Sequence, residues 1–291
     1  MDVQAKHIYQ VELTNLCNLK CSYCPIPTSK RQKGYMSEEV FQKVLNHMTK
    51  IGQKLLILHN FGEPLLHPNL ERFVFMAFHR GLLPGFSTNG LLLTEERFDA
   101  LVAAGLHWMC ISVHNREAAE KYRHFLPYAR KKGVVLFARN FADTSYLLGE
   151  STNVPLTEKH DFAGTAPTPT AKNTSRKGYE RCDFLLSNYY VVLWDGTVVA
   201  CCNDERGLTR LGHIDSISTI SHKPKYPLCD NCPGGLYHND FLFRERFLSR
   251  RFLFGKHPFG RYMVANIFYL IEFLKNSKRS ISAMVQKRHT S

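Results

Sequence analysis

The chain has 291 residues, 44% of them hydrophobic and 22% charged, which is ordinary for a globular protein with a sizeable core. Its formal net charge of +13 favours an anionic partner without choosing among nucleic acid, a phosphorylated substrate and a membrane surface. The opening residues carry no secretion signal, and the longest apolar run, 263–274, is too short to cross a bilayer. We therefore expect a cytoplasmic protein in which disulfides are rare.

Strand-like and helix-like segments alternate in the first half of the chain. Apolar density predicts strands at 7–13, 54–60, 85–89, 107–114 and 133–139. Helices are predicted between them: one that follows an N-cap at Ser37, then 69–80, 95–104 with Thr94 as N-cap, and 116–132. This order is typical of an α/β protein with a parallel sheet or barrel, whose strands end at one edge.

The alternation stops after residue 140. Residues 146–180 are poor in apolar side chains and predict a loop or linker, and 189–202 predicts a hairpin that turns at Asp195-Gly196. The last 52 residues carry eleven Lys or Arg against three Asp or Glu, mixed with Phe and Leu. We predict a basic helical tail at 241–291 that packs through its Phe side, with membrane or lipid-linked substrate contact and a polyanion site as alternatives.

Eight of the nine cysteines occur in groups, which is typical of metal sites in a reducing compartment. The exception is Cys110, predicted to be a core thiol. Cys17, Cys21 and Cys24 directly follow the first predicted strand. Three thiolates do not complete a tetrahedral zinc site, whereas on a [4Fe–4S] cluster they leave one iron free to bind a substrate or cofactor.

The Cx3Cx2C motif, with Tyr23 before its last cysteine, resembles the radical S-adenosylmethionine (SAM) enzymes. Gly62-Glu63-Pro64 after the second strand and the STNG segment at 87–90 after the third agree with this resemblance. It covers residues 8–140 and extends to about residue 233. It implies a partial (β/α) barrel of five to six parallel strands, a [4Fe–4S] cluster on the three cysteines, and SAM bound at the free iron.

The resemblance also implies which residues meet SAM and substrate. The implied SAM contacts are Tyr23, Gly62, Glu63, Pro64, Ser87, Thr88, Asn89 and Ser112. His114 and Arg139, at the ends of the fourth and fifth strands, are candidates for substrate contacts. The alternatives are a solvated turn carboxylate for Glu63, simple turn formation for residues 87–89, and no role in binding for the residues at the later strand ends.

Four downstream cysteines, Cys182, Cys201, Cys229 and Cys232, could by themselves hold zinc or an iron–sulfur cluster. When they follow a radical SAM core in the chain, the hairpin at 189–202 and the LGHIDSISTI segment at 211–220 resemble the SPASM or twitch extension. Five cysteines instead of seven imply the twitch form, a β-hairpin plus helix at 181–240 with one auxiliary [4Fe–4S] cluster, and thus two clusters per chain. Cys202 is then an alternative ligand, a hydrogen-atom donor or a packed thiol.

The resemblance implies that SAM is cleaved reductively to a 5′-deoxyadenosyl radical, which removes a hydrogen atom from the substrate. An auxiliary cluster with four cysteine ligands favours electron acceptance, and hence dehydrogenation of a sugar, aminocyclitol or related natural product. The alternatives are an epimerase with a cysteine hydrogen donor and a peptide maturase. A zinc or iron–sulfur module that binds nucleic acid is disfavoured, because the sequence contains no finger or aromatic strand platform.

Partners and domain limits follow from the same resemblance. We expect a small-molecule or peptide substrate, with an anionic or lipid-linked one left open, and a flavodoxin- or ferredoxin-type electron donor. Nucleic acid is not expected, and peripheral membrane contact would go through the basic tail. The predicted domains are a radical SAM core at 1–145, a linker at 146–180, the auxiliary cluster domain at 181–240 and the tail at 241–291.

Overall fold

The computed structural model describes residues 5–141, 156–157, 182–186 and 188–232. The predicted basic tail at 241–291 and nearly all of the predicted linker at 146–180 lie outside the described residues. The fold is α/β, as predicted from the alternating pattern.

Five parallel strands form the larger sheet, in the order β2-β3-β4-β5-β6. Their carboxyl ends therefore lie along one edge. The predicted linker contains β6, a strand too short to show any alternation in the sequence. The strands are β2 (Leu55–Ile57), β3 (Leu83–Thr88), β4 (Trp108–Val113), β5 (Val135–Phe141) and β6 (Leu156–Thr157).

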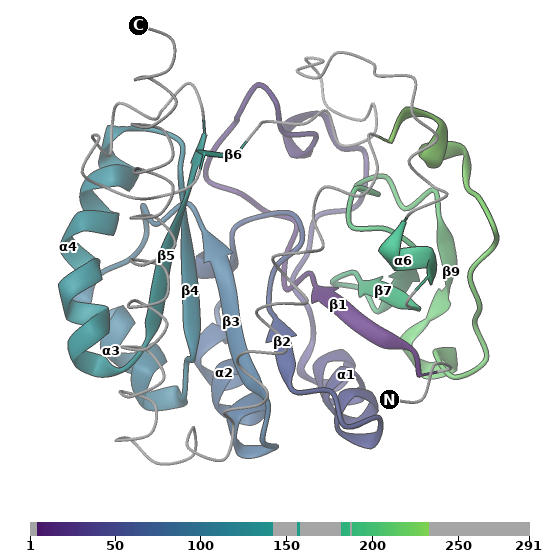
Figure 1. The fold of residues 1–291 in the computed structure, drawn as a ribbon, viewed down its shortest axis with the longest axis horizontal. Helices are drawn as coiled ribbons and strands as arrows, with labels where there is room; N and C mark the ends of the chain where they lie inside the picture. Colours follow the sequence, from purple (N-terminus) through teal and green to yellow (C-terminus); the bar gives the residue numbers. More distant parts are fainter. Residues whose placement is uncertain (1–4, 142–155, 158–181, 187, 233–291) are drawn as a thin grey trace, which may run out of the picture.

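Three helices connect successive strands from β2 to β5 and another precedes β2, and together they cover one face of the sheet (Figure 1). Ser37 and Thr94 cap the first and third by accepting hydrogen bonds from the N–H groups of Val40 and Arg97. Both N-caps and all four helices are therefore confirmed. The helices are α1 (Glu38–Lys50), α2 (Leu70–His79), α3 (Glu95–Ala104) and α4 (Arg116–Lys132).

The first strand, β1 (His7–Val11), does not join the larger sheet. It pairs in parallel with β7 (Tyr189–Val192) in a second sheet of order β1-β7-β8-β9, which also contains β8 (Thr197–Val199) and β9 (Arg210–His213). The prediction that the first five strands form a single sheet was therefore wrong, because the partner of β1 lies far downstream. The predicted hairpin is confirmed, since β7 and β8 are antiparallel around the Asp195-Gly196 turn.

A buried side-chain amide links β1 to β2, which lies beside it (Figure 1). Gln53 accepts a hydrogen bond from the N–H of Ile8 at 3.0 Å, and its amide nitrogen donates to the carbonyls of Ile8 and of Leu55, the latter at 3.2 Å. Gln53 is 4% exposed. One glutamine thus connects the two sheets where no backbone ladder does.

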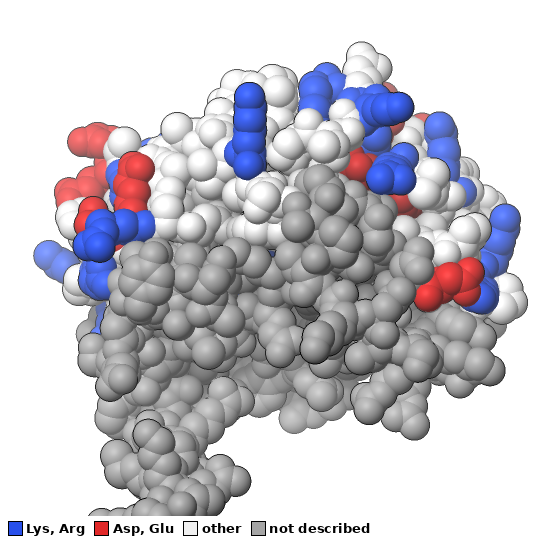
Figure 2. Space-filling view, turned by 90° about the horizontal axis from the view of Figure 1, so that it is seen from above, with Lys and Arg blue, Asp and Glu red and all other residues white. Residues whose placement is uncertain are grey.

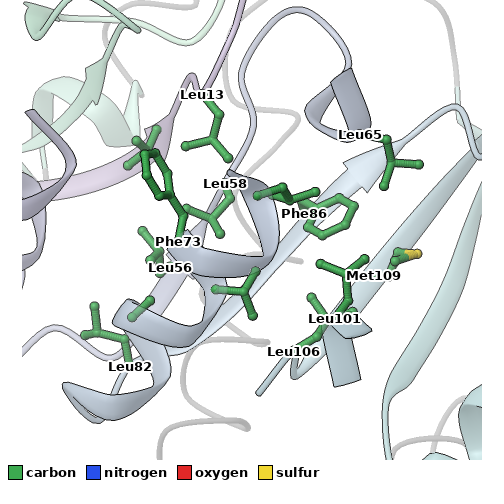
Figure 3. Packing of buried hydrophobic residues seen from close by; sticks show 14 of the residues in the cluster. Leu13, Leu56, Leu58, Leu65, Phe73, Leu82, Phe86, Leu101, Leu106 and Met109 are labelled. Carbon is green, nitrogen blue, oxygen red and sulfur yellow. The ribbon is translucent and has the colours of Figure 1, made fainter. Parts of the chain in front are cut away.

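The two faces of the larger sheet have different neighbours. On the helix side, Leu56, Phe86 and Met109 pack with Phe73 and Leu101 (Figure 3).

On the opposite face, Leu55, Leu83 and Trp108 pack with Tyr9 and Tyr189 of the second sheet. Gly85 makes room for the indole, because a Cβ there would lie 2.3 Å from the ring of Trp108. Apolar side chains thus fill the space between the sheets toward the strand starts, and polar side chains occupy the strand ends. Cys110 belongs to the same cluster at 1% exposure, which confirms the prediction of a core thiol.

Basic side chains, Lys and Arg, are dispersed over the described part of the face drawn in Figure 2 instead of gathered in one patch. Among the described residues, no helix combines the length and apolarity needed to span a membrane.

The Gln53 bridge predicts a specific loss of stability. Gln53→Leu leaves the buried backbone groups of Ile8 and Leu55 without partners, and we expect the free energy of unfolding to fall by about 2–4 kcal/mol. Gln42→Leu, on the exposed face of α1, serves as control and should change it by about 0.5 kcal/mol or less. Urea unfolding of the reduced, cluster-free protein measures both, and equal losses in the two variants would contradict the bridge.

Candidate functional site

A pocket opens at the carboxyl ends of the strands and collects most of the predicted site residues. The predicted residues that do not line it are Pro64, which begins a 3₁₀ turn, and the four cysteines predicted to hold the auxiliary cluster, Cys182, Cys201, Cys229 and Cys232. The predicted residues that line the pocket are Cys17, Cys21, Tyr23, Cys24, Gly62, Glu63, Ser87, Thr88, Asn89, Ser112, His114, Arg139 and Cys202. Residues separated by up to 185 positions in the sequence therefore border one space.

The turn after β2 lies directly on the cysteine loop. Gly62 has φ +77°, and a Cβ there would lie 2.2 Å from the carbonyl oxygen of Thr14. The next residue, Glu63, donates its backbone N–H to the carbonyl of Leu16 at 2.7 Å. Only glycine permits this approach, so the Gly62 turn helps to set the position of the loop that begins at Cys17.

The Glu63 carboxylate joins the turns after β2 and β3. It accepts hydrogen bonds from the N–H of Leu65 at 3.0 Å, the hydroxyl of Thr88 at 2.7 Å and the N–H of Asn89 at 2.8 Å. Glu63 is 2% exposed, so the alternative of a solvated turn carboxylate was wrong. Burial raises its pKa, against the opposing effect of these hydrogen bonds.

Two further hydrogen bonds connect the strand ends to the cysteine loop. The Asn89 side chain donates to Asn18 Oδ1 at 2.8 Å, and the hydroxyl of Tyr23 is hydrogen-bonded to Nδ1 of His114. His114, predicted as a substrate contact, thus contacts the aromatic residue of the motif. Asn18 was missed by the sequence analysis, because an asparagine between two cysteines carries no signal of its partner.

The three thiols of the first motif fit an iron–sulfur cluster. Burial, with smaller contributions from Glu63 and Cys21, raises the pKa of the Cys17 thiol. Burial and the two neighbouring thiols of the motif together raise the pKa of Cys24 to about 12. Such thiols become thiolates near neutral pH only beside a strong cation such as iron. Among the described residues, no three His, Cys, Asp or Glu side chains are grouped to hold a single metal ion, but a cluster binds each thiolate to a different iron.

The second cysteine group comes from three separate segments. Cys182 precedes α6 (Asp183–Leu186), Cys201 follows β8, and Cys229 lies in the 3₁₀ turn Pro227–Asn231. Burial raises the pKa of the Cys182 thiol, with smaller contributions from Cys201 and Cys229. The N–H of Cys232 donates to the carbonyl of Cys229 at 3.3 Å, which places the fourth cysteine on the adjoining turn.

Cys201 and Cys202 lie side by side beyond the end of β8, and their thiols are hydrogen-bonded to each other. Cys201 interacts electrostatically with Cys182 and Cys229, and Cys202 lines the same pocket as Cys17 and packs at the edge of the inner apolar cluster. The pair thus connects the second cysteine group with the pocket. The loop that carries it is shaped by a buried carboxylate: Asp204 accepts hydrogen bonds from the N–H groups of Leu208 and Thr209.

A buried ion network joins the two cysteine loops. Arg31, seven residues after the first motif, donates to both carboxylate oxygens of Glu12, at 2.9 and 2.8 Å. Its Nε lies 3.6 Å from Glu205 Oε1, in the loop after Cys202. Glu12 and Glu205 are 0% and 1% exposed. The sequence analysis missed all three residues, because nothing local marks an arginine and two glutamates as partners.

Comparison with known proteins agrees with this geometry. Residues 11–131 match the radical SAM superfamily, and residues 182–233 match the SPASM iron–sulfur cluster-binding domain. The chain thus contains a radical SAM domain followed by a SPASM domain. As a radical SAM enzyme with a SPASM domain, it uses SAM and iron–sulfur clusters, which confirms the predicted cofactors.

The radical SAM relatives differ in how much of this chain they share. The S-adenosyl-L-methionine-dependent 2-deoxy-scyllo-inosamine dehydrogenase of Niallia circulans is 27% identical over 247 residues, covering 77% of this chain and 91% of the dehydrogenase. The crystal structure of BtrN in complex with AdoMet and 2-DOIA has the same fold, with 22% identity, a TM-score of 0.55 and coverage of 88% and 91% of the two chains.

Other relatives share a shorter segment. The tungsten-containing aldehyde ferredoxin oxidoreductase cofactor-modifying protein of Pyrococcus furiosus is 33% identical over 109 residues, which are 37% of this chain and 30% of that protein. The similarity to this protein is thus confined to a part of each chain.

The ion network predicts a large effect from a single substitution. Arg31→Met leaves Glu12 and Glu205 buried without a cation, and we expect the free energy of unfolding to fall by about 3–5 kcal/mol. Lys30→Met, at an exposed neighbouring position, should change it by about 0.5 kcal/mol or less. Both are measured by urea unfolding of the reduced, cluster-free protein; a small loss in Arg31→Met would show that the carboxylates do not need this cation.

The Gly62 turn predicts a loss of cluster binding. Gly62→Ala forces a Cβ onto the carbonyl of Thr14, and after anaerobic reconstitution we expect the iron of the first cluster to be missing. Gly52→Ala is the matched control, because Gly52 also has a positive φ, +72°, but nothing lies within 4 Å of its Cβ position. The control should keep its iron and sulfide content, and full iron content in Gly62→Ala would refute the role of the turn.

Proposed function

We propose that this radical SAM enzyme dehydrogenates a carbinol carbon of a polyhydroxylated small molecule, with an auxiliary [4Fe–4S] cluster as electron acceptor. The observation that carries the proposal is the shared pocket: residues of the SAM motif border the same space as Cys202, the neighbour of Cys201 in the second cysteine group. The Niallia circulans dehydrogenase supports it, because its similarity extends across both the radical SAM and the SPASM regions of this chain.

The proposed ligands follow the two cysteine groups. Cys17, Cys21 and Cys24 would hold the cluster that binds SAM, and Cys182, Cys201, Cys229 and Cys232 would hold one auxiliary cluster. Bound there, SAM and the clusters would supply the redox chemistry: one substrate hydrogen atom ends in 5′-deoxyadenosine, the second electron passes to the auxiliary cluster and a proton is released, leaving a ketone.

The chain's own residues would orient the reactants and exclude water. Glu63 and Asn89 hold the turns after β2 and β3 against the cysteine loop, and His114 holds Tyr23. We propose that Gly62, Ser87, Thr88 and Ser112 complete the SAM site with them. Apolar side chains in the lining, among them Leu19, Ile26 and Phe61, limit the access of water that would quench a reactive intermediate.

A second candidate is epimerisation, because the Cys202 thiol lines the pocket. In that reaction the thiol would return a hydrogen atom to the opposite face of the substrate. A peptide substrate is less favoured. The PqqA peptide cyclase of Rhodopseudomonas palustris is 35% identical to this chain, but over 109 residues that make up 29% of the cyclase.

The proposal also requires a partner that supplies low-potential electrons. We propose a donor of the flavodoxin or ferredoxin type and a cytoplasmic location, where such donors operate. Peripheral membrane contact would depend on the basic tail at 241–291, outside the described residues.

The decisive test is anaerobic turnover. Reconstituted enzyme should bind about eight irons, four per cluster, and should form 5′-deoxyadenosine when SAM and dithionite are added. Cys17→Ala should abolish this product. Cys229→Ala should still form it but lose oxidised substrate, because the second electron has no acceptor. An enzyme with intact clusters and no 5′-deoxyadenosine would overturn the proposal.

Deuterated solvent separates the two candidate outcomes. Dehydrogenation places no deuterium on the oxidised carbon, whereas epimerisation through an exchangeable thiol places one there. Cys202→Ser should abolish epimerisation and leave a ketone product if dehydrogenation is the reaction. Deuterium incorporation that depends on Cys202 would replace the first candidate by the second.

A further inference from the structure

Besides the SAM motif, the pocket has a second group of polar side chains that no part of the motif explains. Gln10 lies in β1, His59 and Asn60 follow β2, and Arg139 lies in β5. Of these, only Arg139 was singled out from the sequence. Their hydrogen-bonding state indicates what kind of substrate group they can bind, and the inference below rests on the proposed small-molecule function.

His59 is a neutral imidazole with an assigned tautomer. Its Nδ1 accepts a hydrogen bond from the N–H of Ser87 at 2.9 Å, so its proton resides on Nε2. Burial, with a smaller effect from the positive charge of Arg139, lowers the pKa of His59 to about 3. His59 is therefore a hydrogen-bond donor through Nε2 at every pH at which the enzyme would work.

Gln10 presents its amide to that donor. Its Nε2 lies 3.3 Å from His59 Nε2, while its Oε1 is buried and has no partner among the described residues. Because the two ends of an amide are nearly isosteric, the opposite orientation satisfies His59 with Gln10 Oε1. That orientation leaves the Gln10 NH₂ as an unpartnered buried donor at the pocket wall.

Two further donors border the same pocket. The Nδ2 of Asn60 is buried without a partner among the described residues. Arg139 is exposed, and no carboxylate of the described part of the chain forms an ion pair with it. The described lining of the pocket thus contains one full positive charge and two amide NH₂ groups with unused hydrogen-bonding capacity.

Acceptors are scarce in comparison. Glu63 is the only carboxylate among the described lining residues, and both of its oxygens already accept hydrogen bonds. A substrate ammonium group would need a free carboxylate or several free carbonyls. The relative named for 2-deoxy-scyllo-inosamine acts on an amine, so the polarity of this pocket points to a different substrate group.

We infer that the substrate presents an anionic, oxygen-rich group, a carboxylate or a phosphate, to Arg139, Gln10 and Asn60. Arg139 supplies the charge and a planar set of donors suited to either group, and the amides of Gln10 and Asn60 donate to its remaining oxygens. His59 acts as a positioning residue, because its Nε2 proton orients Gln10. This assigns the enzyme to acidic or phosphorylated sugars and polyols instead of amino sugars.

Binding of simple probes tests the inference independently of turnover. We would measure the affinity of the reconstituted, SAM-bound enzyme for D-glucuronate, glucose 1-phosphate, glucose and glucosamine by anaerobic calorimetry. One of the two anionic probes should bind at least about tenfold more tightly than glucose, since a charge-assisted hydrogen bond contributes about that much. The comparison of the affinities for glucuronate and glucose 1-phosphate decides whether the pocket prefers a carboxylate or a phosphate.

Variants connect the selectivity to the named residues. Arg139→Gln should weaken the binding of the preferred anionic probe by about 10- to 100-fold and leave the affinity for glucose unchanged. Arg139→Lys should restore part of the lost affinity. Gln10→Glu should shift the preference toward glucosamine. Lys131→Gln, on the exposed surface of α4, is the control and should change nothing.

The outcomes separate this inference from the proposed function. Three results would each overturn the anionic assignment. These are tightest binding of glucosamine, no preference among the probes, and equal effects of Arg139→Gln and Lys131→Gln. Failure to form 5′-deoxyadenosine with intact clusters would instead overturn the proposed reaction, and the binding preferences would still report on the pocket.

Discussion

The parallel pairing of β1 with β7 is the interaction on which the site depends. It makes the first strand of the chain part of the C-terminal sheet and so joins the segment that leads into Cys17 to the segment that carries Cys202. The Arg31 network then closes the contact between these segments by placing one guanidinium between Glu12 and Glu205. Without this pairing, the strand that leads into the first cysteine motif and the hairpin that leads into Cys202 would not belong to one sheet.

Desolvation is the second constraint on the site. The cysteine loop is packed by the Gly62 turn and by the Glu63 carboxylate, and this packing removes water from thiols that must ionise to bind iron. The high pKa of Cys24 shows the cost of burial in the metal-free chain, and iron would offset that cost by stabilising the thiolate. Burial also keeps His59 neutral. A buried donor that stays without a partner costs free energy, so each unpartnered donor in the pocket favours a ligand that offers it an acceptor.

Function within the radical SAM superfamily is decided outside the SAM motif. The relatives that share only about 110 residues with this chain include a cofactor-modifying protein and peptide cyclases. The names of these relatives describe different substrates, although they share the same segment with this chain. Gln10 lies in β1, and His59 and Asn60 directly follow β2, but none of them belongs to the motif. They are consequently the positions where this chain can differ from its relatives in the substrate it accepts.

The sequence by itself determined the features that depend on neighbouring residues. The N-caps at Ser37 and Thr94, the helices α3 and α4, and the Asp195-Gly196 hairpin were predicted because capping, periodicity and turn chemistry act over a few positions. The cysteine spacing likewise identified the family and its cofactors.

Only the tertiary structure decided which sheet contains β1, that Cys202 lines the same pocket as Cys17, and that Arg31 lies between Glu12 and Glu205. Each depends on a contact between residues far apart in the chain, where the energetic gain comes from burial and pairing that no local pattern records. The polarity of the pocket belongs with them, because a donor is free or satisfied only once its neighbours are in place.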